Sequence, residues 1–334
     1  MSGVVLTDAT QDGPPALSIV VPVYRSADCL AALAAAVAAA LGPAGWAYEL
    51  ILINDGSPDE TWPVIERLCR EDPRVVGIDL RRNFGQDNAI LTGLRAARGR
   101  LAAVMDDDLQ HDPADLPALL ARLEQPGPDG VPPDVVYADF RVKRQPAWKN
   151  LGSWFNGKVA EYVLDKPRGV YLSPYKVLRR EVGELICRYD GPDPYVDGLL
   201  YQVTGRFARL PVEHHRRYAG RSNYNFLRSV AVWARLATGF SVRPLRLVTW
   251  CGLAMGALGG LLAAAVVAYR LAYPERFLAA VAGWASLMVG LLVIGGVEMV
   301  FLGVMGEYVG RMHTAVAGKK PQATVRAVIR GGGG

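Results

Sequence analysis

Short apolar runs alternate with helix-like stretches along the first two thirds of the chain. The apolar runs are Leu17–Val23, Glu49–Ile53, Val75–Leu80 and Leu101–Met105, and the helix-like stretches between them are Cys29–Leu41, Asp59–Cys69 and Asp87–Ala97. This alternation predicts an α/β fold with a mostly parallel sheet. In such sheets ligands bind beyond the carboxyl ends of the strands. Tyr24, Asp55 and Asp106 follow three of the predicted strands, so we expect a site there.

Two long uncharged segments follow in the last third of the chain. Leu247–Tyr269 and Phe277–Val297 contain no charged residue, and the polar break Arg270–Arg276 separates them. A helix of either length spans a hydrocarbon core of about 30 Å. We therefore predict transmembrane helices at residues 246–270 and 277–305. They form a hairpin whose two ends lie on the same side of the membrane.

Composition and charge support the membrane assignment and orient it. The chain is 51% apolar and 21% charged, with a net charge of +5 and a mean hydropathy of +0.15. Residues 206–246 carry nine arginines and one glutamate, and residues 306–334 are also basic, whereas the region before residue 206 is acidic. Positive flanks stay in the cytoplasm. We predict a multi-pass protein of the inner (cytoplasmic) membrane with its large domain and both termini cytoplasmic.

The arginines that precede the first uncharged segment have two interpretations. Phe226–Phe240 places apolar residues between Arg228 and Arg235, as in an amphipathic helix that lies on anionic membrane lipids. The same positive charge could instead serve to bind a nucleic acid. The membrane segments and the lack of a recognisable nucleic-acid motif argue against that. We predict interfacial helices at residues 226–245 and no nucleic-acid partner.

The other segments complete the predicted domain organisation. We expect a disordered tail at residues 1–16, one domain at 17–225 and a cytoplasmic, solvated tail at 306–334. The four cysteines include no CxxC pair, which predicts free thiols in a reducing compartment. Gly252, Gly256 and Gly260 recur on one face of the first uncharged segment. That face packs on the second segment or on another subunit of a dimer or tetramer.

An acidic stretch gives the strongest chemical signal. Asp106, Asp108 and Gln110 alternate with other residues directly after a predicted strand. In an extended strand end, residues two apart share a face, so the three side chains could present oxygen atoms to one cation. Oxygen-only ligation suits Mg²⁺ or Mn²⁺. The alternative is an acidic turn or helix start, and the second acidic strand end at Asp55 favours the metal.

Several motifs together resemble a known enzyme family. They are Ser18–Tyr24 (SIVVPVY), Asn54–Ser57 (NDGS), Leu80–Gln86 (LRRNFGQ), Asp106–His111 (DDDLQH), His214–Tyr224 (HHRRYAGRSNY) and Phe301–Arg311 (FLGVMGEYVGR). Over residues 17–315 they resemble the inverting family 2 glycosyltransferases of the GT-A fold, whose sheet is Rossmann-like. More narrowly, the chain is similar to the dolichyl- and undecaprenyl-phosphate sugar transferases. The usual D-D-G of that family is N-D-G here, with Asn54 in the first position.

The resemblance assigns roles to individual residues of this chain. For the nucleotide sugar it implies Pro22 and Tyr24 along the nucleoside pocket, Asp55 at the base or ribose, Asp106 near the ribose and metal, and Arg217 at the diphosphate. For the metal it implies Asp106, Asp108 and Gln110, and for the lipid phosphate it implies Arg141, Arg144 and Ser153. Asp106, Asp108 and Arg217 are thus expected catalytic residues, and Asp197 is a fourth candidate.

The expected reaction is a metal-dependent transfer of a sugar from a nucleotide sugar, with uridine the favoured base, to a polyprenyl phosphate, with inversion. The acceptor is anionic at neutral pH, so no strong base is required. Asp193 or Asp197 could still act as a base or bind a sugar hydroxyl, or could belong to a turn rich in Asp and Pro. The alternatives are a processive polysaccharide synthase, whose Q-x-x-R-W motif does not occur here, and a non-catalytic nucleotide-binding scaffold.

Overall fold

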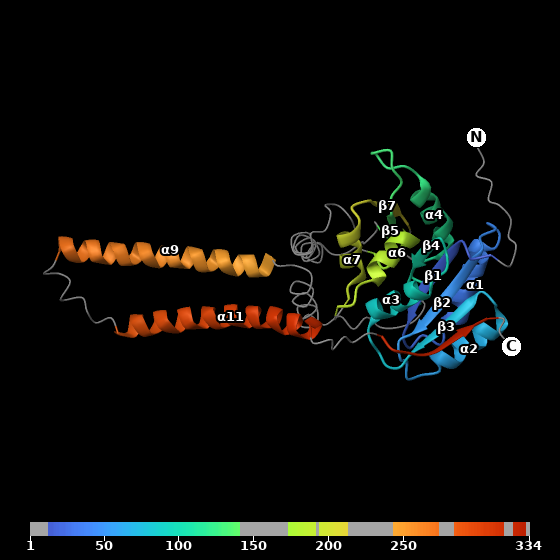
Figure 1. Ribbon diagram of the computed structural model, residues 1–334, viewed down its shortest axis with the longest axis horizontal. Coiled ribbons are helices and arrows are strands. Elements are labelled where there is room, and N and C mark those ends of the chain that lie inside the picture. Colours follow the sequence, from blue (N-terminus) through green and yellow to red (C-terminus); the bar gives the residue numbers. More distant parts are fainter. Residues whose placement is uncertain are drawn as a thin grey trace. The chain divides into compact units, whose positions relative to one another are not determined.

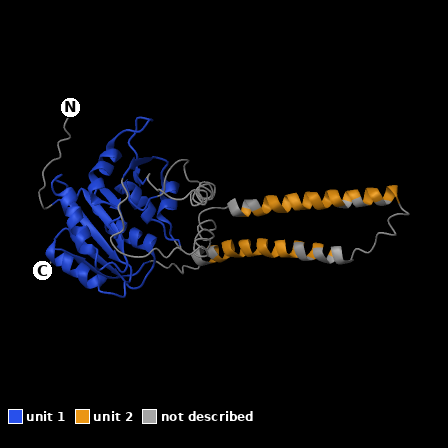
Figure 2. Cartoon of the chain, turned by 180° about the vertical axis from the view of Figure 1, so that it is seen from behind, with its two compact units in different colours: residues 1–224, 320–334 blue, residues 225–319 orange. Residues whose placement is uncertain are grey.

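The computed structural model describes residues 13–140, 173–191, 194–212, 243–273, 284–316 and 323–331. The chain divides into two compact units, one formed by residues 1–224 with 320–334 and the other by residues 225–319 (Figure 2). The predicted interfacial helices lie almost wholly outside the described residues, as does most of the predicted N-terminal tail.

The first unit is built on one eight-stranded sheet (Figure 1). Its strands are β1 (Leu17–Val23), β2 (Tyr48–Asn54), β3 (Val75–Leu80), β4 (Leu101–Val104), β5 (Val135–Asp139), β6 (Lys176–Arg179), β7 (Phe207–Pro211) and β8 (Val325–Arg330). The strand order is β7-β5-β6-β4-β1-β2-β3-β8. The pairs among β1, β2, β3 and β4 are parallel, whereas β6 and β8 join antiparallel. The predicted α/β fold with a mostly parallel sheet is confirmed.

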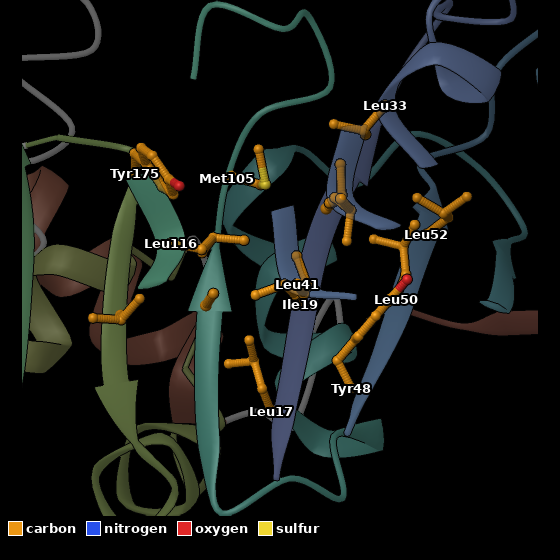
Figure 3. Close-up of a cluster of buried hydrophobic side chains, with 14 of the residues drawn as sticks. Leu17, Ile19, Leu33, Leu41, Tyr48, Leu50, Leu52, Met105, Leu116 and Tyr175 are labelled. Atoms are coloured by element: carbon orange, nitrogen blue, oxygen red, sulfur yellow. The ribbon is translucent and has the colours of Figure 1, made fainter. Parts of the chain in front are cut away.

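Helices cover both faces of this sheet. The described helices of the first unit are α1 (Leu30–Leu41), α2 (Thr61–Glu71), α3 (Gln86–Ala96), the short 3-10 helix η1 (Pro113–Asp115), α4 (Leu116–Glu124), α6 (Arg180–Cys187) and α7 (Val196–Val203). Ile19 joins the apolar cluster that includes α1 (Figure 3). The next residue, Val20, meets Gly93 of α3, as expected for side chains that alternate across a strand.

Burial on two faces explains the continuous apolar runs. Every residue of β1, β2, β3 and β4 is buried, and strands covered on both sides need apolar residues at successive positions. Helix α1 contributes the buried residues Leu30, Leu33, Val37 and Leu41, spaced at one helical turn. Each such side chain stabilises the fold by about 1.5–3 kcal/mol. This core is a rigid platform for the loops at the strand ends.

Strand register brings several loops to one edge. Val23, the last residue of β1, pairs with Asn54, the last residue of β2. Val104, the last residue of β4, pairs with Lys176, the first residue of the antiparallel strand β6. The segments that follow β1, β2 and β4 therefore meet at the carboxyl edge, together with the start of β6.

The end of the chain differs from the expected solvated tail. Helix α11 (Trp284–Val316) runs past residue 306, and β8 pairs with β3, with Asp79 opposite Ala327. The prediction of a tail over residues 306–334 is therefore wrong. β-branched residues such as Val325 and Ile329 favour a strand, and Ile329 packs against the core. The arginines between these apolar residues are typical of an edge strand.

The second unit contains two long helices, α9 (Arg243–Ala272) and α11. They lie alongside each other and run in opposite directions (Figure 1). Among the described residues, only α9 is long and apolar enough to cross a membrane, over the 22 residues Val248–Tyr269. Its apolar side chains are open to the surroundings, with Trp250 and Leu261 about 70% exposed. The second predicted membrane helix begins outside the described residues and stays a prediction.

Candidate active site

A pocket opens at the carboxyl edge of the sheet. It is lined by Pro22, Val23, Tyr24, Asp55, Asn83, Gly85, Gln86, Asp106, Asp107 and Asp108. The structure thus brings together five residues selected from the sequence, namely Pro22, Tyr24, Asp55, Asp106 and Asp108. It adds Asp107 and three residues of the Leu80–Gln86 motif, Asn83, Gly85 and Gln86, none of which had an assigned role. The predicted metal ligand Gln110 is not among the lining residues.

Asp55 fixes one wall of the pocket. It follows β2, is buried, and its two carboxylate oxygens accept the backbone N–H groups of Phe84 at 2.7 Å and Gly85 at 2.9 Å. Burial raises the pKa of Asp55, and the two N–H groups oppose that shift. Each carboxylate oxygen keeps a second lone pair. Asp55 therefore holds the loop before α3 in place and can still accept a hydrogen bond from a ligand.

The acidic stretch does not continue β4 as an extended strand. The strand ends at Val104, residues 107–111 form bends, and Leu109 adopts a positive φ of 57°. The cause is local, because Oδ1 of Asp108 accepts the N–H of Gln110 at 3.1 Å, which closes a turn. The expectation that Asp106, Asp108 and Gln110 share one face of a strand end is therefore wrong. The aspartates nevertheless line the same pocket.

The three aspartates are close enough to influence one another. Burial, followed by the charges of Asp108 and Asp107, raises the pKa of Asp106 to about 7. Gln86 donates a hydrogen bond to Asp106 at 2.8 Å. Asp107 accepts hydrogen bonds from the Ser26 hydroxyl and the Tyr24 N–H, which tie the acidic loop to the end of β1. Repulsion between these carboxylates is what a bound cation relieves.

The donor set suits a hard cation that is shared with a ligand. Among the residues that the structure describes, no group of three or more His, Cys, Asp and Glu side chains could by itself hold a metal ion. Mg²⁺ is commonly held by one or two carboxylates, waters and substrate phosphates. Asp106 and Asp108 fit that mode of binding, in which the ligand completes the coordination.

His111 holds the start of the acidic loop in place through a hydrogen bond. The sequence did not indicate this role. Its buried ring stacks between Phe140 and Tyr175, with ring centroids 5.4 and 5.2 Å away. Its Nδ1 accepts the backbone N–H of Asp106 at 3.1 Å. The only signal in the sequence was the position of a histidine directly after the acidic stretch.

Replacing His111 with phenylalanine should lower kcat by about 10- to 100-fold, whereas the melting temperature should change little. The aromatic ring would keep the stacking, whereas the N–H of Asp106 would lose its buried acceptor. Steady-state kinetics and thermal unfolding of the same preparation check this. If His111→Phe keeps the wild-type kcat, the histidine does not position the acidic loop.

Asp197 lies in a buried polar network and not among the residues that line the pocket. It forms an ion pair with Lys176, which is 2% exposed, and accepts the Tyr137 hydroxyl at 2.9 Å. Lys176 also lowers the pKa of Asp106, against the larger effect of burial. Lys176 is thus a buried cation beside the acidic loop, and nothing in the sequence pattern marked it. A catalytic role of Asp197 stays a prediction.

Replacing Lys176 with methionine should destabilise the first unit by about 3–5 kcal/mol, because Asp197 is left as a buried charge without its cation. The double variant Lys176→Met with Asp197→Asn should recover part of that loss. Denaturant unfolding of the two single variants and the double variant gives the coupling. Additive losses in the double variant would show that the ion pair contributes nothing.

The remaining predicted site residues lie outside the described residues. These are Arg141, Arg144, Ser153, Arg217 and the alternative base Asp193. Their assigned roles stay predictions.

Comparisons with known proteins agree with the motifs. Residues 18–184 match the family described as Glycosyl transferase family 2. The chain is 29% identical over 317 residues to an undecaprenyl-phosphate 4-deoxy-4-formamido-L-arabinose transferase of Enterobacter sp. (strain 638), with 94% of both chains covered. It is 31% identical over 320 residues to the protein of that name from Shewanella sediminis (strain HAW-EB3), which covers 94% of this chain and 93% of the relative.

Solved structures with a similar fold include glucosyl-3-phosphoglycerate synthase from Mycobacterium tuberculosis. Its complex with UDP has a TM-score of 0.47 and 18% identity, covering 67% of this chain and 78% of that one. Its complex with Mn²⁺ and UDP-glucose has a TM-score of 0.48 and 18% identity, covering 67% and 77%. The family match and the relatives that span nearly the whole chain confirm the resemblance read from the motifs, and the chain belongs to glycosyl transferase family 2.

Proposed function

We propose that this glycosyltransferase moves one sugar from a nucleotide sugar, with a UDP-sugar favoured, to a polyprenyl phosphate at the cytoplasmic face of the membrane. The observation that carries the proposal is the pocket in which Asp55 and the aspartates 106–108 meet at the carboxyl edge of the sheet. This is the edge at which α/β sheets bind nucleotides.

The donor side of the proposal rests on the chemistry of that pocket. Helix α3 begins at Gln86, a lining residue, and the amino end of a helix favours an anionic group such as a diphosphate. A bound Mg²⁺ or Mn²⁺ would neutralise the diphosphate and so improve it as a leaving group. Asp106 and Asp108 would hold that ion, with Gln110 as a further proposed ligand, and Arg217 would contact the diphosphate.

The acceptor side rests on two independent observations. Both relatives named above carry undecaprenyl phosphate in their names and align with nearly the whole chain. Helix α9 exposes a continuous apolar surface of the length needed to span a bilayer, and such a surface is stable only in an apolar environment. An acceptor embedded in the same membrane fits this arrangement. Arg141, Arg144 and Ser153 are the proposed contacts of its phosphate.

The proposed step needs little more from the protein than positioning. An oxygen of the acceptor phosphate forms a bond to the anomeric carbon while the bond from that carbon to the diphosphate oxygen breaks, and the nucleoside diphosphate leaves. Attack from the face opposite the leaving group inverts the anomeric centre. The acceptor is already anionic, so no proton has to be removed. Asp55 and the loop that it holds fix the nucleoside, and the aligned geometry supplies most of the rate.

One reconstitution experiment tests the proposal. The full chain is placed in vesicles with undecaprenyl phosphate, Mg²⁺ or Mn²⁺ and a panel of nucleotide sugars, and the extracted lipids are analysed by mass spectrometry. We expect one sugar on a single lipid phosphate, and none when EDTA is added. Release of long polymer would instead identify a processive synthase. The absence of product with every donor would favour a non-catalytic scaffold.

A further inference from the structure

Strand β8 contributes an arginine to the end of β3, although β8 follows both long helices in the sequence. The guanidinium of Arg326 lies 3.2 Å from a carboxylate oxygen of Asp79. It also donates a hydrogen bond to the backbone carbonyl of Arg81 at 3.1 Å. One side chain from strand β8 thus contacts both Asp79 near the end of β3 and Arg81 just after it.

Asp79 also contacts the neighbouring strand, β2. Its side chain is buried, and Oδ1 accepts the side-chain N–H of Asn54 at 2.7 Å. Asn54 stands opposite Asp79 in the parallel pairing of β2 with β3. The other end of the Asn54 amide, Oδ1, accepts the backbone N–H of Ser57 at 3.1 Å. Arg326, Asp79 and Asn54 therefore form a continuous chain of contacts that ends in the loop carrying Asp55.

The second contact of Arg326 leads to the loop that Asp55 holds. Arg81 opens the loop whose Phe84 and Gly85 N–H groups bind Asp55. The N–H of Arg81 donates to the carbonyl of Thr324, just before β8, at 2.9 Å. Both loops that converge on Asp55 are thus tied to the C-terminal strand.

We propose that Arg326 is a positioning residue for the donor pocket, so that the segment after the long helices is a working part of the nucleotide-sugar site. The inference rests on the proposed function, in which Asp55 and its loop bind the nucleoside. It also explains why position 54 carries Asn where the family usually has Asp. The amide donates to Asp79, whereas a second carboxylate would repel that buried charge.

The test compares two arginines of the same strand. Arg326→Ala should raise the KM for the nucleotide sugar by about 10-fold, change kcat by less than about 3-fold and leave the KM for the lipid phosphate unchanged. Arg326→Lys keeps the charge but cannot make both contacts in the same way, so it should recover only part of the loss. Arg330→Ala is the matched control, because Arg330 approaches Glu49 at the other end of β8 and should leave the donor KM at the wild-type value.

Two results would overturn the inference. One is an unchanged donor KM in Arg326→Ala, and the other is an equal rise in Arg326→Ala and Arg330→Ala, which would mean that β8 acts only through general stability. The KM values are compared only if the wild-type chain makes the lipid-linked sugar. If the wild type makes no product, the proposed function fails, and this result is distinct from failure of the inference about Arg326.

A second pair of variants keeps the inference testable if Arg326→Ala is unstable. Asn54→Asp should raise the donor KM by about 10-fold, because it places two carboxylates face to face. Adding Asp79→Asn restores a hydrogen bond between an amide N–H and a carboxylate at these two positions. It should bring the KM for the nucleotide sugar back to within about 3-fold of wild type. If the second substitution makes the loss larger, the two side chains are not coupled in the proposed way.

Discussion

Replacing Asp108 with alanine should lower kcat for sugar transfer by on the order of 1000-fold, while the protein stays folded. Asp108 lines the pocket together with Asp106, and in the proposed reaction these carboxylates hold the cation that neutralises the leaving diphosphate. Loss of one preorganised electrostatic group at such a centre typically costs a factor of 100 to 1000 or more. Product formation from the active nucleotide sugar measures the loss directly.

Two control variants separate the charge of Asp108 from its role in the turn. Asp108→Asn keeps a side-chain oxygen for the N–H of Gln110 but removes the charge, so it should be nearly as inactive as the alanine variant. Asp129 accepts the N–H of Val131, two residues ahead, in the same way but outside the pocket. Asp129→Ala should therefore retain wild-type kcat. An active Asp108→Asn variant would show that the negative charge of Asp108 is not required, which contradicts its proposed role in neutralising the cation.

Replacing Gly56 with alanine should disable the donor pocket and cost about 3 kcal/mol of stability. Gly56 has a φ of 64°, and a Cβ there would stand 2.5 Å from the carbonyl carbon of Arg82 and 2.6 Å from the nitrogen of Asn83. A left-handed conformation costs an alanine about 1–2 kcal/mol, and overpacking adds about 1–3 kcal/mol. Relief of the clash would push apart the two loops that meet at Asp55, so the donor KM should rise at least about 30-fold.

Gly130→Ala is the matched control for Gly56→Ala. Gly130 has a φ of 77°, but a Cβ there would meet no atom within 4 Å, and it lies outside the pocket. It should show the conformational cost alone, with an unchanged donor KM. Thermal unfolding and donor titration of both variants separate the two effects. Equal kinetics in the two variants would mean that the close approach of the loops does not matter for donor binding.

The sequence predicted the parts of the molecule whose physics is local. Apolar runs such as Leu17–Val23 form buried strands because helices cover both faces of the sheet. In a parallel arrangement the ends of the strands meet at one edge, which is why Tyr24, Asp55 and Asp106 could be assigned to one site from the sequence. The long uncharged segment that became α9 was equally evident from composition alone.

The parts that the sequence missed depend on contacts between distant positions. Lys176 reaches Asp197 across 21 residues, and Arg326 reaches Arg81 across 245 residues. No local pattern encodes such pairs. The predicted geometry of the acidic loop was wrong for a different reason. The turn closed by Asp108 replaces the extended strand end that the spacing of Asp106, Asp108 and Gln110 suggested. The C-terminal segment was predicted as a tail because its pairing with β3 joins positions about 250 residues apart, which no local pattern shows.

The most direct test of the proposed donor site is whether UDP strengthens the binding of Mn²⁺ to the pocket. Electron paramagnetic resonance of Mn²⁺ with the full chain gives the bound fraction, with and without UDP. We expect weak binding of Mn²⁺ alone, at least about 10-fold tighter binding when UDP completes the coordination, and loss of that gain in Asp108→Ala. Binding of Mn²⁺ that is indifferent to UDP, or unchanged in Asp108→Ala, would contradict the proposed donor site.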